Sequence, residues 1–290
     1  MQLGVSSYSY SRLVRNGTLK QHEVIAAAKE AGFQAIEFST IAVPKGQTLA
    51  EYADVLRQEA RQVGIPIANY TIGADFLNGS NGDLEAEIKR VKAEVDIAEI
   101  LGAPGMRHDA TGGFPAGHTG PAGFDDALPR LIEGCRAVTE YAAGKGIRTM
   151  VENHGFFCQD SARVEKLING VAHPNFGVLA DIGNFLCVDE NSGEAIGRLA
   201  RHIFHTHAKD FHIKSGDGFN PGEGWFMSRG GNFLRGAIIG HGDVPLLQAL
   251  RALKRSGFNG VLSIEFEGME DVKESLRIGL ANLRRLVETA

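Results

Sequence analysis

The chain has 290 residues, of which 43% are hydrophobic and 22% are charged, and it carries a net charge of −5. This composition is ordinary for a globular protein with one large domain or two ordinary ones. No basic block occurs, which argues against nucleic-acid binding, because such binding depends on clustered Lys and Arg side chains.

The cysteine pattern and the N-terminus exclude further classes. Cys135, Cys158 and Cys187 are widely spaced and form no CxxC pair. We therefore expect neither a disulfide framework nor a thiolate zinc site, and a reducing, cytoplasmic location is favoured. The N-terminus has none of the features of a signal peptide. No apolar run approaches the ~18 residues of a membrane span, so we expect no membrane association.

One pattern repeats along the chain. A helical stretch ends at a glycine, and a short apolar segment follows that ends in a polar or acidic residue. Glycine is common after a helix because it adopts the left-handed conformation without a Cβ clash. The five copies are AGFQAIEF (31–38), VGIPIANY (63–70), LGAPGMRHD (101–109), KGIRTMVEN (145–153) and SGFNGVLSIEFE (256–267). Three further apolar segments lack the leading glycine, namely QLGVSSYS (2–9), FGVLAD (176–181) and HIFHTH (202–207).

Helical patterns separate these eight predicted strands, for example at residues 23–32, 49–64, 84–102 and 244–257. Strands that alternate with helices predict a parallel sheet. Eight such units over this length predict an α/β fold, a single-domain (β/α)8 TIM barrel that spans residues 1–290. An open doubly wound sheet is the alternative, but no GxGxxG motif follows the first strand.

The spacing between the last two predicted strands is unusually long. From His207 to Glu265 the gap is about twice that between the preceding strand ends, and the excess is a glycine-rich stretch around residues 211–243. A long connection with little helical pattern is commonly functional. We interpret it as an extended loop after the seventh strand, serving as a lid or a partner-binding segment.

Polar residues end the last four predicted strands, at Glu152, Asp181, His207 and Glu265. Each alone is more often a helix cap or a solvent-facing group, but in a barrel the carboxyl ends of the strands converge on one site. Three buried carboxylates placed together need a cation, because an unpaired charge is costly to bury. Three carboxylates and one imidazole suit one divalent ion, with Mn²⁺ favoured over Mg²⁺, Co²⁺ or Zn²⁺.

Five sequence blocks resemble a known family. They are VENHG (151–155), ADIGNF (180–185), HTHAKD (205–210), GHGDVPLLQAL (240–250) and GVLSIEFEG (260–268). The chain resembles the xylose-isomerase-like TIM barrel superfamily, the sugar phosphate isomerase/epimerase family, which includes ketose 3-epimerases, inosose dehydratase, hydroxypyruvate isomerase and endonuclease IV. The resemblance implies the same four metal ligands, with the two glutamates also acting as acid/base groups.

The chain departs from this family at two positions. Epimerases and endonuclease IV often carry a histidine where Asn184 stands, and the residue between the glycines of the GHG block is usually acidic, whereas here it is His241. Several ligands of the three-metal cluster of endonuclease IV also lack a match. With the acidic net charge, this makes a DNA repair role improbable.

The resemblance implies a metal-dependent sugar isomerase or epimerase, in which Glu152 and Glu265 transfer a proton beside a carbonyl through an enediolate. An alternative is a lyase or dehydratase of the same fold, which would act on a keto-sugar, an inosose or a 3-keto glycoside. In that reaction His108, at the end of the fourth strand, would be the acid/base group. A non-catalytic carbohydrate-binding barrel is the third reading.

Further residues are candidates for substrate contacts. The first group comprises Arg107, Lys209, His241, Trp225 and Asn184, and the second group comprises Glu37, Asn69, His154, His205, His212 and Arg229. Phe114, Phe156 and Phe157, with Trp225, are candidates for an apolar wall against a sugar ring. We expect a small carbohydrate or keto-sugar as the substrate and a homo-oligomer as the assembly, with a hetero-subunit partner as an alternative.

Overall fold

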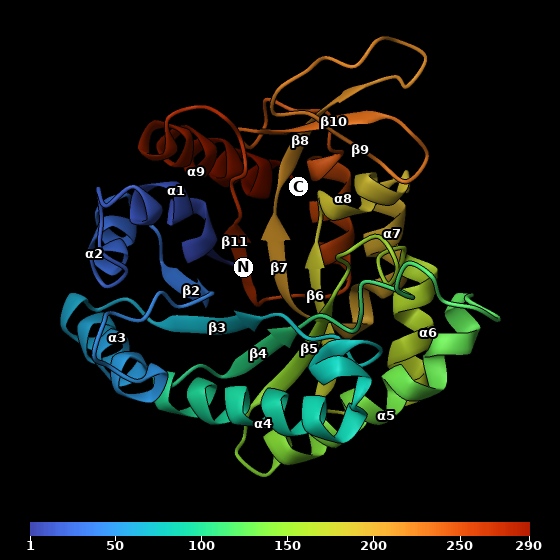
Figure 1. Ribbon diagram of the computed structural model, residues 1–290. Helices are drawn as coiled ribbons and strands as arrows, with labels where there is room; N and C mark the ends of the chain where they lie inside the picture. The colour runs from blue at the N-terminus through green and yellow to red at the C-terminus, as the bar shows by residue number, and fades with distance from the viewer.

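Eight parallel strands close into a barrel in the computed structural model, which describes residues 1–290 (Figure 1). The barrel strands are β1 (Gln2–Ser6), β2 (Ala35–Ser39), β3 (Ile67–Ile72), β4 (Gly105–His108), β5 (Arg148–Glu152), β6 (Phe176–Asp181), β7 (Ile203–Ala208) and β11 (Val261–Ile264). Each strand pairs with its neighbours in the chain, and β11 pairs with both β7 and β1. The predicted (β/α)8 barrel and its eight strand positions are confirmed.

The helices form the outer layer around the barrel (Figure 1). They are α1 (Ser11–Arg15), α2 (Glu23–Glu30), α3 (Leu49–Val63), α4 (Leu84–Leu101), α5 (Phe124–Ala143), α6 (Ser161–Val171), α7 (Ser192–Leu199), α8 (Leu246–Arg255) and α9 (Val272–Thr289). Short 3-10 helices lie at Ser7–Tyr10, Gly79–Gly82, Asn184–Val188 and Ala200–His202. None of the helices combines the length and apolar character that a bilayer crossing needs.

Local signals explain where these helices begin and end. Thr48 caps α3 and forms a reciprocal capping box with Glu51, and Asp83 caps α4. Gly64 and Gly102 end the same two helices with φ angles of 71° and 73°. A residue with a Cβ is strained in this left-handed conformation, so the repeated glycine marks the turn into the next strand.

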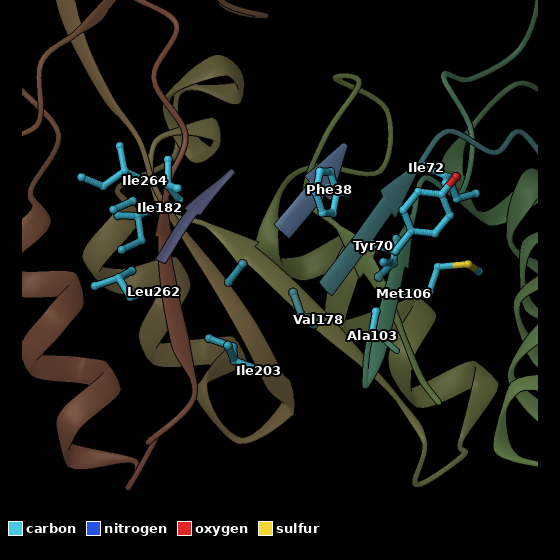
Figure 2. Close-up of a cluster of buried hydrophobic side chains, with 14 of the residues drawn as sticks. Phe38, Tyr70, Ile72, Ala103, Met106, Val178, Ile182, Ile203, Leu262 and Ile264 are labelled. Atoms are coloured by element: carbon cyan, nitrogen blue, oxygen red, sulfur yellow. The ribbon is translucent and has the colours of Figure 1, made fainter. Parts of the chain in front are cut away.

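Strand alternation separates an apolar layer from a polar barrel interior. Successive side chains of a strand point to opposite faces. The outward set packs against the helices, and Figure 2 shows part of this buried layer, including Phe38, Tyr70 and Met106. The inward set is polar and buried and includes Glu37 and Arg107. The barrel therefore directs polar groups toward its own axis.

The segment predicted as an extended loop folds into a small antiparallel sheet, which the sequence pattern did not indicate. Its strands are β8 (Asp210–Lys214), β9 (Phe226–Met227) and β10 (Phe233–Ala237), in the order β8-β10-β9. Figure 1 shows it beyond the C-terminal ends of the neighbouring barrel strands. Asp189 accepts hydrogen bonds from Ser228 and from the backbone of Gly230, which ties the sheet to the loop after β6.

Candidate metal centre and active site

Four side chains from four adjacent strands meet at the C-terminal end of the barrel. Glu152 and Asp181 are the last residues of β5 and β6, His207 lies in β7, and Glu265 directly follows β11. All four are buried, and their possible ligand atoms lie within 4.8 Å of one another. We call these residues the four-residue cluster.

His207 Nδ1 lies at the centre of the cluster. It is 3.6 Å from both Asp181 Oδ2 and Glu265 Oε2, and 3.8 Å from Glu152 Oε1. This nitrogen is buried and has no hydrogen-bond partner. Burial disfavours a charged imidazole, yet nearby carboxylates raise the pKa of His207 well above its usual value. The site therefore attracts positive charge, and its oxygen-rich donor set fits one divalent ion.

Glu37, in the middle of β2, fixes the opposite edge of the His207 ring. Its Oε1 atom is 2.5 Å from His207 Nε2, and its Oε2 atom is 2.9 Å from His205 Nε2. Burial alone would raise the pKa of Glu37, but the two histidines hold it well below its usual value. An ionised Glu37 accepts the Nε2 proton, so His207 would offer the lone pair of Nδ1 to an ion that replaces the Nδ1 proton.

A second group of side chains also has the residue types that bind metal ions. It consists of Glu37, His205 and His207. A separation of 2.5 Å between Glu37 Oε1 and His207 Nε2 is a hydrogen bond. A metal ion bound to both atoms would lie about 2.0–2.2 Å from each of them. Two atoms in direct hydrogen-bond contact leave no room for an ion between them. We therefore assign Glu37 and His205 to hydrogen bonding within the barrel.

Two buried cations hold the carboxylates of the cluster. Arg107 Nε is 2.5 Å from Glu152 Oε2, and Lys209 Nζ is 2.7 Å from Glu265 Oε2 and 3.1 Å from Asp181 Oδ2. Burial raises the pKa of Glu152, although Arg107 opposes this effect. For Asp181, Lys209 and His207 outweigh burial and lower the pKa to about 2. Arg107 and Lys209, predicted to contact substrate, lie in the site.

Asn184 links the two sides of the cluster. Its amide nitrogen donates to Glu152 Oε1 at 3.0 Å, and its carbonyl oxygen accepts from Lys209 at 3.2 Å. These two partners fix the orientation of the amide. Asn184 therefore bridges the carboxylate of Glu152 and the ammonium group of Lys209.

Four groups lie further out, and we call Tyr8, Asp109, His154 and Glu267 the rim residues. Asp109 Oδ1 is 2.9 Å from both Arg107 and His154 Nδ1, and Glu267 is 3.2 Å from Lys209. Side-chain exposure rises from 0% at His207 to 22% at Asp109 and 52% at His154. The site therefore opens to solvent through the rim.

Asp109, Glu267 and Tyr8 were missed by sequence reasoning. Strand alternation could have found two of them, because Asp109 follows Arg107 by two positions and Glu267 follows Glu265 by two. Tyr8 lies in a 3-10 helix after β1, where no period applies. Burial and the charge of Glu267 raise the pKa of the Tyr8 phenol. Tyr8 therefore lies on the same side of the site as Glu267.

The prediction that His108 is a catalytic acid/base group is not supported by the geometry and is corrected. In β4 the Arg107 side chain points to the cluster, so His108 points outward toward the helices. Its fully buried ring packs between Phe76 and Phe176 and bonds the Asp109 carbonyl oxygen at 2.8 Å. Burial lowers the pKa of His108 to about 4, which fits a neutral packing residue.

Two other predicted substrate contacts are not among the residues that contact the cluster. Trp225 directly precedes β9 of the small sheet, and Lys214 and Arg235 lie 5.6 Å and 5.5 Å from its ring. His241 is exposed and lines a surface cleft of about 440 Å³ beside α9. Both were placed near the substrate because the segment 211–243 was treated as one loop over the barrel.

The secondary candidates divide in the same way. Asn69 is buried inside the barrel, where it bonds Thr71 at 3.3 Å. His212 lies in β8 opposite Arg235 of the small sheet, and Arg229 pairs with Asp160 at 3.0 Å.

The predicted apolar wall is only partly formed. Phe114 and Phe157 pack against each other with a ring separation of 5.9 Å. Phe156 is 42% exposed with a φ of 65°, so its ring is available to solvent at the loop after β5.

Comparison with known proteins agrees with this architecture. The family described as xylose isomerase-like TIM barrel matches residues 25–286. None of the curated proteins matches the sequence.

Solved structures with similar folds include enzymes of different reactions. The 3-keto-D-glucoside 4-epimerase YcjR of E. coli superposes with a TM-score of 0.70 at 15% identity, covering 98% of this chain and 99% of that one. The probable 3-DHS dehydratase AsbF of Bacillus anthracis gives 0.71 at 18% identity, covering 98% and 99%. The IOLI protein with a bound zinc atom gives 0.74 at 18%, covering 99% and 98%.

The cluster predicts stabilisation by a divalent ion. After treatment with EDTA, we expect added Mn²⁺, Mg²⁺, Co²⁺ or Zn²⁺ to raise the Tm, with a clear preference among the four. Binding to the folded state alone stabilises by about 2.7 kcal/mol at 100 times Kd. Asp181→Asn should remove the shift, whereas the exposed control Asp125→Asn should retain it. An unchanged Tm with every ion contradicts the metal site.

The contact between Glu37 and His207 predicts an indirect effect on metal affinity. Glu37→Gln should weaken binding by about 10- to 100-fold, because the amide no longer imposes the Nε2–H form of His207. Isothermal titration of the metal-free protein measures this directly. Ser263→Ala, which removes only the hydroxyl beside His205, should change affinity far less. Binding of two ions by the native protein would contradict the hydrogen-bonding assignment.

Proposed function

Because the chain belongs to the xylose isomerase-like TIM barrel family, we propose that it is a divalent-metal-dependent isomerase or epimerase of a small carbohydrate. The reaction is proton transfer at a carbon beside a carbonyl. The observation that carries the proposal is His207 Nδ1, unpartnered and facing three carboxylate oxygens. The activity for which the 3-keto-D-glucoside 4-epimerase is named, in a protein of similar fold, supports this class of reaction.

Glu152, Asp181, His207 and Glu265 are the residues that would hold the ion. When bound, a divalent ion supplies Lewis-acid stabilisation of the negative charge that develops on a carbonyl oxygen as the adjacent carbon loses its proton. We propose Mn²⁺ as the native ion. A cytoplasmic location and a homo-oligomeric assembly, with a second kind of subunit as an alternative, stay predictions.

The two glutamates of the cluster are suited to move the proton. Glu152 and Glu265 come from β5 and β11, with β6 and β7 between them, so they reach the centre from two sides. One carboxylate accepts the proton from the substrate carbon, and the other returns a proton to the opposite face or to the next carbon. The first outcome is epimerisation and the second is isomerisation.

The buried cations keep these carboxylates in place for that role. Arg107 holds one oxygen of Glu152, and Lys209 holds one oxygen of Glu265. Each pair directs the remaining oxygen of its carboxylate and limits side-chain motion, which lowers the entropic cost of reaching a reactive geometry.

Solvent deuterium exchange tests the proposed reaction. With Mn²⁺ supplied, a ketose or inosose substrate should take up deuterium at the carbon beside its carbonyl. Glu152→Gln and Glu265→Gln should each slow exchange by about 10²-fold or more, because a positioned acid/base group is lost. Bound metal is measured in each variant, to separate loss of the ion from loss of the base.

The exposed Glu133→Gln on α5 is the matched control, and it should exchange at the native rate. The proposed function fails if no ketose, inosose or related hydroxy-ketone exchanges with the metal-loaded protein.

A lyase or dehydratase is the second candidate, favoured by the rim pair of Asp109 and His154. Asp109 accepts from His154 Nδ1 at 2.9 Å, while Nε2 makes no hydrogen bond within the chain. Such a pair positions an imidazole to give a proton to a leaving group. Proton removal at the cluster combined with proton donation at the rim amounts to elimination from a keto-sugar, an inosose or a 3-keto glycoside.

The rim pair predicts which histidine matters for elimination. With a 3-keto glycoside, His154→Ala should reduce release of the aglycone by about 10²-fold or more, while deuterium exchange at the cluster persists. Asp109→Asn should give a smaller loss in the same direction. His118→Ala, an exposed histidine after β4, serves as the control. Loss of exchange and release together in His154→Ala would contradict separate roles for cluster and rim.

A further inference from the structure

Carboxylates outnumber Lys and Arg side chains around the cluster. Six carboxylates lie in one connected set of contacts, namely Glu37, Asp109, Glu152, Asp181, Glu265 and Glu267. Besides the histidines, only Arg107 and Lys209 contribute positive charge to this set. A divalent ion and these two side chains would balance four of the six carboxylates, so any further positive charge would have to come from the histidines of the set, namely His154, His205 and His207.

Neither basic side chain is free to bind an anion. Arg107 is 7% exposed and divides its donors between Glu152, Asp109 and the Ile72 carbonyl oxygen. Lys209 is 3% exposed and lies within 3.2 Å of three carboxylates and of the Asn184 oxygen. An incoming phosphate or carboxylate would have to displace one of these buried acids, which costs more than exchanging a water molecule.

Backbone donors in the turns after β6 and β7 are occupied as well. TIM barrels often bind phosphate at the loops after their last two strands. Here the N–H groups of Gly240 and Gly242, in the connection from β7 to α8, donate to Asp210 at 2.8 Å and 2.9 Å. After β6, the N–H groups of Gly183 and Asn184 donate to Asp181. A phosphate at either turn would face a carboxylate.

Three arginines further from the cluster are also engaged. Arg12 donates to the Met269 carbonyl oxygen, Arg229 pairs with Asp160, and Arg235 lies 3.5 Å from Glu270. The rim instead offers acceptors, because Asp109 and Glu267 are partly exposed carboxylates. Carboxylates accept hydrogen bonds from hydroxyl groups, which a sugar supplies in number.

We propose that the site takes a neutral hydroxy-ketone or keto-sugar and rejects substrates that carry phosphate or carboxylate groups. This inference rests on the proposed function and names the substrate class of the same site. Selectivity of this kind comes from repulsion of the wrong ligand as well as attraction of the right one. The selecting residues are the rim carboxylates and the acids that occupy Arg107 and Lys209.

Matched sugars test the proposal on the Mn²⁺-loaded protein. D-fructose and dihydroxyacetone are compared with D-fructose 6-phosphate and dihydroxyacetone phosphate, with binding measured by calorimetry and deuterium uptake by NMR. We expect each neutral member to bind at least tenfold more tightly than its phosphate. Equal or tighter binding of the phosphates, or no binding of either neutral sugar up to about 100 mM, overturns the inference.

Salt and a charge variant separate electrostatic rejection from poor fit. From 0.1 M to 1 M salt the Debye length falls from about 10 Å to about 3 Å. The difference in binding affinity between neutral and phosphorylated sugars should therefore become smaller. Glu267→Gln should narrow it as well, whereas the exposed Glu274→Gln on α9 should not. If neither salt nor Glu267→Gln changes this difference in affinity, electrostatic repulsion is not its cause and the inference is overturned.

Failure of the proposed function gives a different result. In that case the neutral sugars bind with the expected selectivity, but no deuterium enters any of them. The substrate class then stands as a binding preference, while the isomerase or epimerase reaction is rejected.

Discussion

Mutual repulsion of buried carboxylates is the constraint on which the site depends. Glu152, Asp181 and Glu265 lie around one imidazole nitrogen and out of contact with bulk water. Such an arrangement is stable only if positive charge lies between or beside the acids. Arg107 and Lys209 supply part of that charge from outside the cluster, and a divalent ion at the centre would supply the rest. The barrel can concentrate acids here because its strands all end at this face.

The same constraint explains the polar interior beneath the cluster. His207 can present Nδ1 to the carboxylates only if its other nitrogen has an acceptor, and Glu37 provides one from the opposite side of the barrel. Glu37 in turn is buried and ionised, and His205 Nε2 lies 2.9 Å from its second oxygen. Each polar group placed in the barrel therefore requires another. The network fixes the ring of His207 before any ligand arrives.

How much of this the sequence could predict differs from residue to residue. Glu152, Asp181, His207 and Glu265 were found because each ends a strand, and strand ends in a barrel share one face. His108 was misplaced because a strand end alone does not say which face a side chain takes. Its neighbour Arg107 and the period of two decide that question. The small sheet was missed for another reason, since it forms by pairing across residues 210–237, and no local pattern encodes such pairing.

The residues proposed for proton transfer are buried in the barrel, whereas those proposed for substrate selection lie at its partly exposed rim. This separation affects which substitutions can change the reaction. The cluster is fixed by strand ends and by partners such as Glu37 that are themselves buried in the barrel, so a change there disturbs several charges at once. Asp109, His154 and Glu267 extend from the strand ends into loops and are partly exposed. Substitution at the rim can therefore alter the charge that a substrate meets, or supply a proton to a leaving group, while the cluster stays intact. Proton abstraction beside a carbonyl is common to epimerisation and elimination, so the rim is where the two reactions can diverge.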